Sequence, residues 1–474
     1  MRYNVKILIL FLFLAGNLSA QDSLFIRSYG LIGYNYGEKI IQTADSGFIL
    51  LGNKSGFVGN TDMYLIKVDK YGNYMWDKAY GYDEVNWAED FVKTKDNGFV
   101  ITGYMTVPEN NNDYNIMLVK TDFAGNLQWM KNYGGSNWDL AHSLIETPDS
   151  GFIIAGETYS YGNGNNDIFF LKTDKNGDSV WMKTYGGLNT DIGYDINYCH
   201  DGNFIMTGVT NSFGHGGYDA YLMKLDNNGD SIWSRTYGDT LDDKAFAGIE
   251  TFDHGIAITG STNDFNAQGQ DACILKIDST GNKKWINTYG GPNDEEQYDI
   301  IEMPQKGFFS VGYTTSFGYV GSKEFYMIIT DQDGWFITGP TYGGEDNDVA
   351  YSCINTLSGG LAIIGTTESM GLGISNILFL KSDSMGSTNI NSYIHITDID
   401  DNLSESQNIS IFPNPASDNI TISYDSNLKL NNIMILDLIG QPIKSIHPEP
   451  GTNTTIDLSD LPNGIFLIVI KEDN

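Results

Sequence analysis

Short apolar runs and glycine-containing turns alternate along most of the chain. In one stretch, an apolar segment at 141–145 is followed by the runs Gly151–Gly156, Asp167–Asp174 and Trp181–Tyr185. These runs are rich in β-branched and aromatic residues and are separated by Gly, Asn and Asp, as expected for short strands joined by tight turns. No stretch has a sustained helical period. The pattern therefore predicts a repeating unit of four strands.

Three markers show that this unit occurs seven times. A Tyr-Gly pair, a glycine closing the second apolar run, and a third run ending in Asp-x-x-Gly recur at intervals of 51 to 53 residues. The tyrosines are Tyr29, Tyr80, Tyr133, Tyr185, Tyr237, Tyr289 and Tyr342, and a tryptophan stands four residues before five of them. Four-strand units of this length are typical of propeller blades. We therefore predict an all-β chain with a seven-bladed β-propeller over residues 21–396.

The last unit indicates how the ring closes. It supplies only three strands before Asp383, so residues 24–29 are predicted to add its fourth, outermost strand. Such closure removes exposed sheet edges, which otherwise invite aggregation. The competing candidate is a strand at 390–394.

The two ends of the chain differ from the repeats. Residues 1–20 have a basic start, an apolar stretch and a small-residue end, which predicts a signal peptide. No later segment reaches the roughly 20 apolar residues that a membrane helix needs, so the mature chain is predicted to have no transmembrane segment. Residues 397–408 are predicted to be a polar linker. Residues 409–474 contain short alternating strands, which predict a small immunoglobulin-like β-sandwich.

The repeats resemble a bacterial β-propeller family often called SBBP. In one unit the matching residues are Trp181, Tyr185, Gly186, Gly187, Asp191, Gly202, Gly208 and Thr210. The resemblance covers roughly residues 24–385 and implies the propeller fold.

The C-terminal region resembles the type A sorting domain of the type IX secretion system of Bacteroidota. The motif residues are Pro413, Asn414, Pro415, Asp437, Gly440, Asp457, Leu461 and Gly464, within three segments in the family's order. The resemblance implies the type IX secretion machinery as a partner. It also implies a secreted protein, either extracellular or on the outer-membrane surface.

Charge and cysteine content restrict the partners further. Lys and Arg number 27 against 60 Asp and Glu, and the net charge of −33 argues against nucleic acid as a partner. No cofactor is predicted, although the acidic surface would suit Ca²⁺ or a cationic partner. The widely spaced Cys199, Cys273 and Cys353 fit neither a disulfide framework nor a zinc site, and we interpret them as buried apolar residues.

No catalytic motif is present, but two sets of equivalent positions are candidates for binding. Six residues after each repeated tyrosine stand Asn35, Asn86, Asp139, Asp191, Asp243, Glu295 and Asp348. They either bond their own loops, as Asx residues do, or form an acidic rim for a cation. Nine residues after it stand Glu38, Glu89, His142, Tyr194, Phe246, Tyr298 and Tyr351. With Trp87 and Trp138, the aromatic members either stack on a ligand or fill the inner packing layer.

Three functions are compatible with these features. The first is a non-catalytic surface module that binds an extracellular glycan or protein at the propeller rim. The second is a polysaccharide hydrolase or lyase that uses the acidic rim. The third is a structural spacer of the cell envelope. Of these, we favour the binding module, because no catalytic set of residues can be inferred.

Overall fold

The computed structural model divides the chain into two compact units, one of residues 23–396 and one that contains residues 397–474. It describes residues 24–472 apart from 31–32, 56–59, 83–84, 108–112, 264, 266, 268, 305–306, 389–393, 397–409, 413–418, 424–429, 437–441, 449–452 and 462–466. The described residues form strands and no helix. Accordingly, no helix in this part of the chain could cross a membrane.

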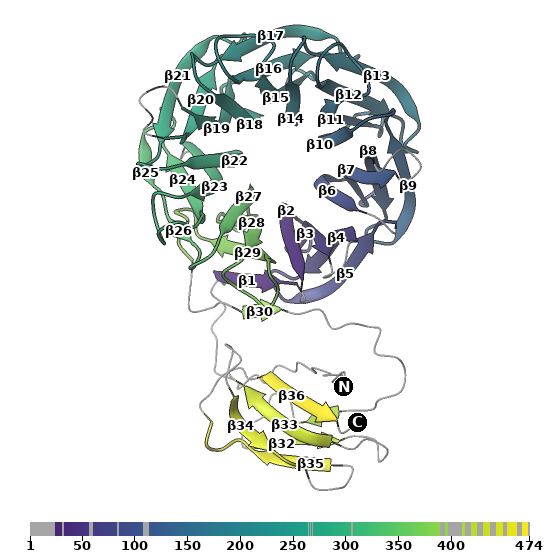
Figure 1. Cartoon of the computed structure of the whole chain (residues 1–474), viewed down its shortest axis with the longest axis vertical. Coiled ribbons are helices and arrows are strands. Elements are labelled where there is room, and N and C mark those ends of the chain that lie inside the picture. The colour runs from purple at the N-terminus through teal and green to yellow at the C-terminus, as the bar shows by residue number, and fades with distance from the viewer. Residues whose placement is uncertain are drawn as a thin grey trace. The chain divides into compact units, whose positions relative to one another are not determined.

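The first unit is a seven-bladed propeller, as the repeats predict (Figure 1). The first six blades are antiparallel sheets whose strands run in sequence order from the centre outward, and the seventh begins in the same way with β27, β28 and β29. The innermost strands are β2 (Tyr34–Gln42), β6 (Asn86–Lys93), β10 (Asp139–Glu146), β14 (Asp191–Tyr198), β18 (Asp243–Glu250), β22 (Glu295–Met303) and β27 (Asp348–Asn355). The second strands are β3 (Phe48–Ser55), β7 (Phe99–Val107), β11 (Phe152–Thr158), β15 (Phe204–Thr210), β19 (Ile256–Thr262), β23 (Gly307–Thr314) and β28 (Leu361–Thr367).

The outer half of each blade follows the same order. The third strands are β4 (Thr61–Val68), β8 (Asp113–Thr121), β12 (Asp167–Thr173), β16 (Asp219–Leu225), β20 (Asp271–Ile277), β24 (Glu324–Thr330) and β29 (Asn376–Ser382). The outer strands of the first five blades are β5 (Tyr74–Tyr80), β9 (Leu127–Tyr133), β13 (Ser179–Tyr185), β17 (Ser231–Tyr237) and β21 (Lys283–Tyr289). In the sixth blade two short strands, β25 (Phe336–Thr338) and β26 (Thr341–Tyr342), both pair with β24. Pro340 lies between them and lacks the N–H that a continuous ladder would use.

The seventh blade combines both ends of the propeller. Strand β1 (Phe25–Tyr29) pairs antiparallel with β29, so it is the fourth strand of this blade. It is not outermost, because β30 (Ile394–Ile396) pairs with it in parallel on its other side. The two segments predicted as alternatives for closing the ring therefore lie side by side. The C-terminal one, β30, begins at Ile394, which is the last residue of the strand predicted at 390–394.

The repeated tyrosine ties each blade to the next. In all seven blades its hydroxyl donates to the carbonyl of the glycine in the next Asp-x-x-Gly turn, for example Tyr185 to Gly229 at 2.7 Å. Gly229 has a φ of +76°, and a Cβ there would lie 2.5 Å from the Trp181 ring. The tryptophan, the tyrosine and the turn glycine thus belong to one contact between blades, which explains why they recur together.

The second and third strands are buried on both faces between neighbouring blades. Strands β11 and β12, for example, contain no exposed residue. Strands covered on both faces appear in a sequence as continuous apolar runs. The three cysteines are also buried and unpaired.

The second unit contains two three-stranded sheets. One has the order β31 (Ser410–Phe412), β32 (Asn419–Ser423), β35 (Asn453–Asp457), and the other β34 (Pro442–Ile446), β33 (Leu430–Leu436), β36 (Leu467–Glu472). Their buried isoleucines include Ile420, Ile422, Ile433, Ile435 and Ile456. An immunoglobulin-like sandwich stays a prediction. The predicted signal peptide and linker lie outside the described residues.

Candidate functional site

The acidic residues that stand six positions after five of the repeated tyrosines lie at the start of the innermost strands rather than in the loops before them. Asp139, Asp191, Asp243, Glu295 and Asp348 are all buried. Asp191 accepts hydrogen bonds from the Gly187 N–H at 2.8 Å, from Ser212 Oγ at 2.6 Å and from the Thr210 hydroxyl. This arrangement holds two loops of one blade together. Ligand binding by these residues stays a prediction, and their burial leaves a ligand little access to the carboxylates.

A β-bulge interrupts every innermost strand at the same place. The pairing with the second strand shifts by one residue between Gly37 and Lys39, and at the equivalent position of the other six blades. A bulge places two residues of one strand opposite a single partner and re-aims their side chains. As a result, two consecutive residues from most blades line the central cavity.

The first of these positions forms the mouth ring, namely Glu38, Glu89, His142, Tyr194, Phe246, Tyr298 and Tyr351. All seven are half-buried. Neighbouring aromatic centroids from His142 round to Tyr351 are 5.5, 5.2, 5.1 and 5.3 Å apart. Five aromatic side chains therefore form an arc, and two glutamates complete the ring.

His142 carries a positive charge within this ring. Its Nε2 lies 3.5 Å from Glu157 and its Nδ1 lies 3.9 Å from Glu89. Burial by itself would lower the pKa of His142, but the hydrogen bonds and charges of Glu157 and Glu89 raise it to about 10. The imidazole is therefore protonated at neutral pH.

The second position forms the floor ring: Lys39, Asp90, Ser143, Asp195, Ala247, Asp299 and Ser352. All but Ser352 line the cavity. The sequence did not predict this ring, because successive side chains of a regular strand point to opposite faces. A residue that follows one pointing to the centre is therefore expected to point away from it. The available signal was the concentration of charge at one repeat position, since four of its seven residues are Lys or Asp.

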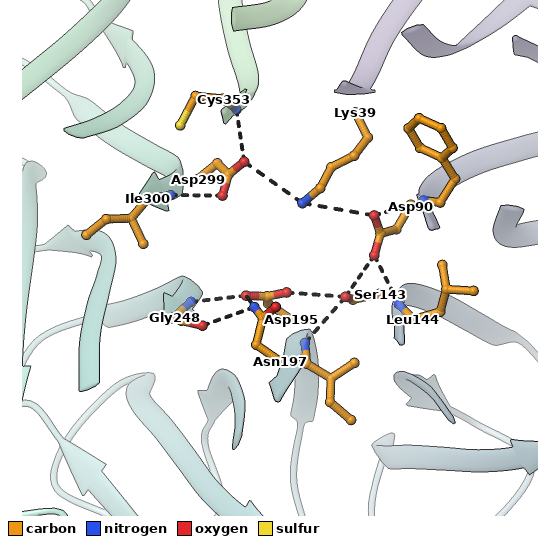
Figure 2. Close-up of polar contacts among 12 residues, drawn as sticks. Lys39, Asp90, Ser143, Leu144, Asp195, Asn197, Gly248, Asp299, Ile300 and Cys353 are labelled. Atoms are coloured by element: carbon orange, nitrogen blue, oxygen red, sulfur yellow. Dashed lines mark hydrogen bonds and ion pairs between the residues drawn. The ribbon is translucent and has the colours of Figure 1, made fainter. Parts of the chain in front are cut away.

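Polar contacts of the floor ring join all seven blades (Figure 2). Lys39 Nζ lies 4.0 Å from Asp90 and 3.9 Å from Asp299. Asp90 accepts from the Leu144 N–H and Asp299 from the Cys353 N–H, both at 3.0 Å. Further contacts run from Asp90 through Ser143 to Asp195, and from Asp195 to the Gly248 N–H, at 2.9, 3.2 and 3.1 Å. Each aspartate thereby ties its own blade to the next one.

The charges of this floor perturb one another. Burial would lower the pKa of Lys39, but the charges of Asp299, Asp90 and Asp195 outweigh it and raise the pKa. Burial and the charges of the neighbouring aspartates together raise the pKa of Asp195 to about 6, although Lys39 and the Gly248 N–H act in the opposite direction. Lys39 is therefore a fixed cation that partly neutralises three carboxylates.

We expect Lys39→Met to lower the free energy of unfolding by about 2 kcal/mol, below the 3–5 kcal/mol typical of a fully buried pair, because a third of the side chain is open to water. Methionine keeps most of the stem but leaves the aspartates without a counterion. Urea denaturation followed by tryptophan fluorescence measures the change. The control is Lys244→Met, since Lys244 is similarly exposed and faces one carboxylate, Glu296, at 3.4 Å. Equal losses in the two variants would contradict the role assigned to Lys39.

The two predicted tryptophans lie outside this cavity. Trp87 stacks with Tyr104 and lies 5.1 Å from the Tyr36 ring, while Trp138 lies 5.3 Å from the Tyr114 ring. Trp138 is 46% exposed. They belong to a separate row of aromatic side chains across the first three blades, and their predicted part in binding remains a prediction.

Together, the mouth ring and the floor ring apart from Ser352 line an open cavity of about 120 Å³. Five carboxylates line it, those of Glu38, Glu89, Asp90, Asp195 and Asp299, against the two cations Lys39 and His142. Among the residues that the structure describes, no cluster of His, Cys, Asp and Glu has the arrangement of a metal site. The cavity can therefore receive a small group that is apolar, cationic or both.

Of the sorting motif, only Asp457 and Leu461 lie within the described residues. Asp457 accepts from the Ser459 N–H at 2.9 Å, and the Leu461 N–H donates to the Leu458 carbonyl at 2.9 Å. These bonds form a turn after β35. Pro413, Asn414, Pro415, Asp437, Gly440 and Gly464 lie outside the described residues.

The molecule thus consists of a seven-bladed propeller and a second, C-terminal unit. Residues 410–474 match the family of secretion system C-terminal sorting domains. Such a type IX sorting tail implies contact with the type IX secretion machinery, export, and a cell-surface or secreted location. A comparison with curated protein sequences found no match.

Several solved structures are distantly similar. PorZ, a surface component of the type IX secretion system of Porphyromonas gingivalis, is 11% identical, with a TM-score of 0.41 over 97% of this chain and 60% of that one. The Pan2 WD40 domain of Neurospora crassa is 10% identical, with a TM-score of 0.45 over 73% and 89%. The polysaccharide lyase Uly1 is 9% identical, with a TM-score of 0.46 over 79% and 92%. Likeness at this level does not indicate a function.

Proposed function

We propose that the protein is an exported, non-catalytic binding module of the SBBP type whose ligand enters the central cavity through the mouth ring. The ligand is part of an extracellular glycan or protein. The observation that carries the proposal is the cavity itself, because the seven blades line it with four different kinds of residue from the same repeat position. Equivalent positions are filled by Glu, His, Tyr or Phe, whereas the contacts between blades repeat. Variation at one position of a repeated scaffold is where specificity can reside.

The proposal includes no catalytic step. The acidic residues suggested for hydrolysis, such as Asp191 and Asp243, are buried and accept hydrogen bonds from their own loops. A general acid or base must reach the proton that it transfers, and these carboxylates face loop donors instead.

The test is a binding screen with the full chain against glycan arrays and extracellular proteins. We expect a ligand whose affinity falls at least tenfold in Tyr194→Ala/Tyr298→Ala, because truncation removes two aromatic contacts worth about 1 kcal/mol or more each. The control is Trp138→Ala/Tyr159→Ala, which removes two exposed aromatic side chains outside the cavity. Circular dichroism verifies that both variants fold. Loss of binding only in the control pair would overturn the proposal and place the ligand on the aromatic row.

A further inference from the structure

The aromatic arc has the dimensions of a cation site. Seven positions spaced evenly at the 5.2 Å that separates Tyr194 from Phe246 lie on a circle with a radius of about 6 Å, which is the reach of a cation–π contact. A cation near the centre of the mouth ring would therefore lie within reach of several aromatic rings at once.

The two glutamates of the mouth ring supply matching charge. Among the described residues Glu38 has no ion-pair partner, and it accepts one hydrogen bond, from Asn53 Nδ2 at 3.0 Å. Burial raises the pKa of Glu38, and the charge of Glu89 raises it further. Two carboxylates that repel each other beside a cavity are stabilised by any cation placed between them.

The remaining charges of the cavity also favour a cation. Five carboxylates against Lys39 and His142 leave the lining negative, and Glu157 and Glu296 add negative charge behind the ring. Lys39 does not reverse this balance, because three aspartates surround it in the floor ring. An anionic ligand would be repelled, and a neutral one would supply no opposite charge to the Glu38 carboxylate.

The cavity is large enough for a head group rather than a whole molecule. A cavity of about 150 Å³ holds one benzene molecule, so the present volume of about 120 Å³ suits a group of similar bulk, such as a trimethylammonium. The rest of the ligand would extend out of the mouth.

We propose that the mouth ring binds the ammonium group of an organic cation, seated between the carboxylates of Glu38 and Glu89 and the rings of Tyr194, Phe246 and Tyr298. This inference rests on the proposed function and names the chemical class of the group that enters the cavity. The glycan or protein ligand would present such a group, as an amino sugar or a methylated lysine does.

The first test compares choline with 3,3-dimethylbutan-1-ol, which has the same shape without the charge. Calorimetric titration of the full chain should show saturable choline binding, and the neutral compound should bind at least tenfold more weakly, as expected for a desolvated cation–π contact. Equal affinities would overturn the cation assignment while leaving the binding function intact. No binding of choline up to tens of millimolar would also overturn the assignment.

The second test locates the bound choline. Glu38→Gln keeps the side-chain shape and removes the charge, so choline affinity should fall at least fivefold. Phe246→Leu keeps an apolar side chain and removes the ring, with a loss of about threefold to tenfold. Glu345→Gln makes the same change of charge at an exposed position outside the cavity and should leave affinity unchanged. If Glu345→Gln weakens binding as much as Glu38→Gln does, the cation is attracted by overall charge and the assignment fails. The proposed function has its own criterion, the loss of screened ligands in the Tyr194 and Tyr298 variant.

Discussion

Replacing Ile26 by aspartate should unfold the propeller at a much lower denaturant concentration than the wild type needs. Ile26 is 3% exposed and packs into the cluster between the sixth and seventh blades that contains Phe309, Phe325 and Leu380. An aspartate there would be an unpaired charge in an apolar core, and we expect a loss of about 4 kcal/mol or more. Because β1 closes the ring, that loss should affect the first and last blades together. Urea denaturation and limited proteolysis near residue 24 would measure it.

A matched control exists for this substitution. Met182 occupies the same repeat position on β13, three residues before the tyrosine, but is 42% exposed. On β5 the equivalent residue is already an aspartate, Asp77. Met182→Asp should therefore change stability by less than about 1 kcal/mol. If both variants lose the same stability, closure by β1 contributes no more to stability than the fourth strand of any other blade.

Removing residues 410–474 should abolish export while leaving the propeller folded. The removed segment matches the sorting-domain family. Residues 23–396 form a compact unit of their own, with their own core. The truncated chain should therefore accumulate inside a host that has a type IX system, with the surface and medium fractions falling to background. Immunoblots of cell fractions would measure the distribution.

Two controls make that result specific. A purified truncated chain should retain the thermal transition of the propeller, which excludes degradation of a misfolded protein. Residues 410–474 fused to an unrelated periplasmic protein should direct it out of the cell. If the truncated chain still reached the surface at the wild-type level, the sorting role of this domain would be wrong.

The local pattern of the sequence contained most of the architecture. Strand positions follow from short apolar runs, because the second and third strands are buried on both faces and are therefore mostly apolar. The number of blades follows from Tyr29 and its six equivalents, because each tyrosine and turn glycine form one interblade bond that every blade repeats. The mouth ring could be named in advance, since its residues vary at a repeated position.

The floor ring and the closing sheet depend on how strands pair with one another, and the sequence of a single strand does not show that pairing. The bulge at Gly37–Lys39 and its equivalents is a shift between two strands, and it alone turns Lys39, Asp90 and Asp195 toward the centre beside the mouth ring. The closing sheet likewise joins residues 25–29 to 394–396, segments from opposite ends of the propeller whose contact leaves no periodic signal. The sequence by itself thus determined the blades and the exported class of the protein. Only the tertiary structure decided which side chains share the cavity, because that depends on register and on the closure of the ring.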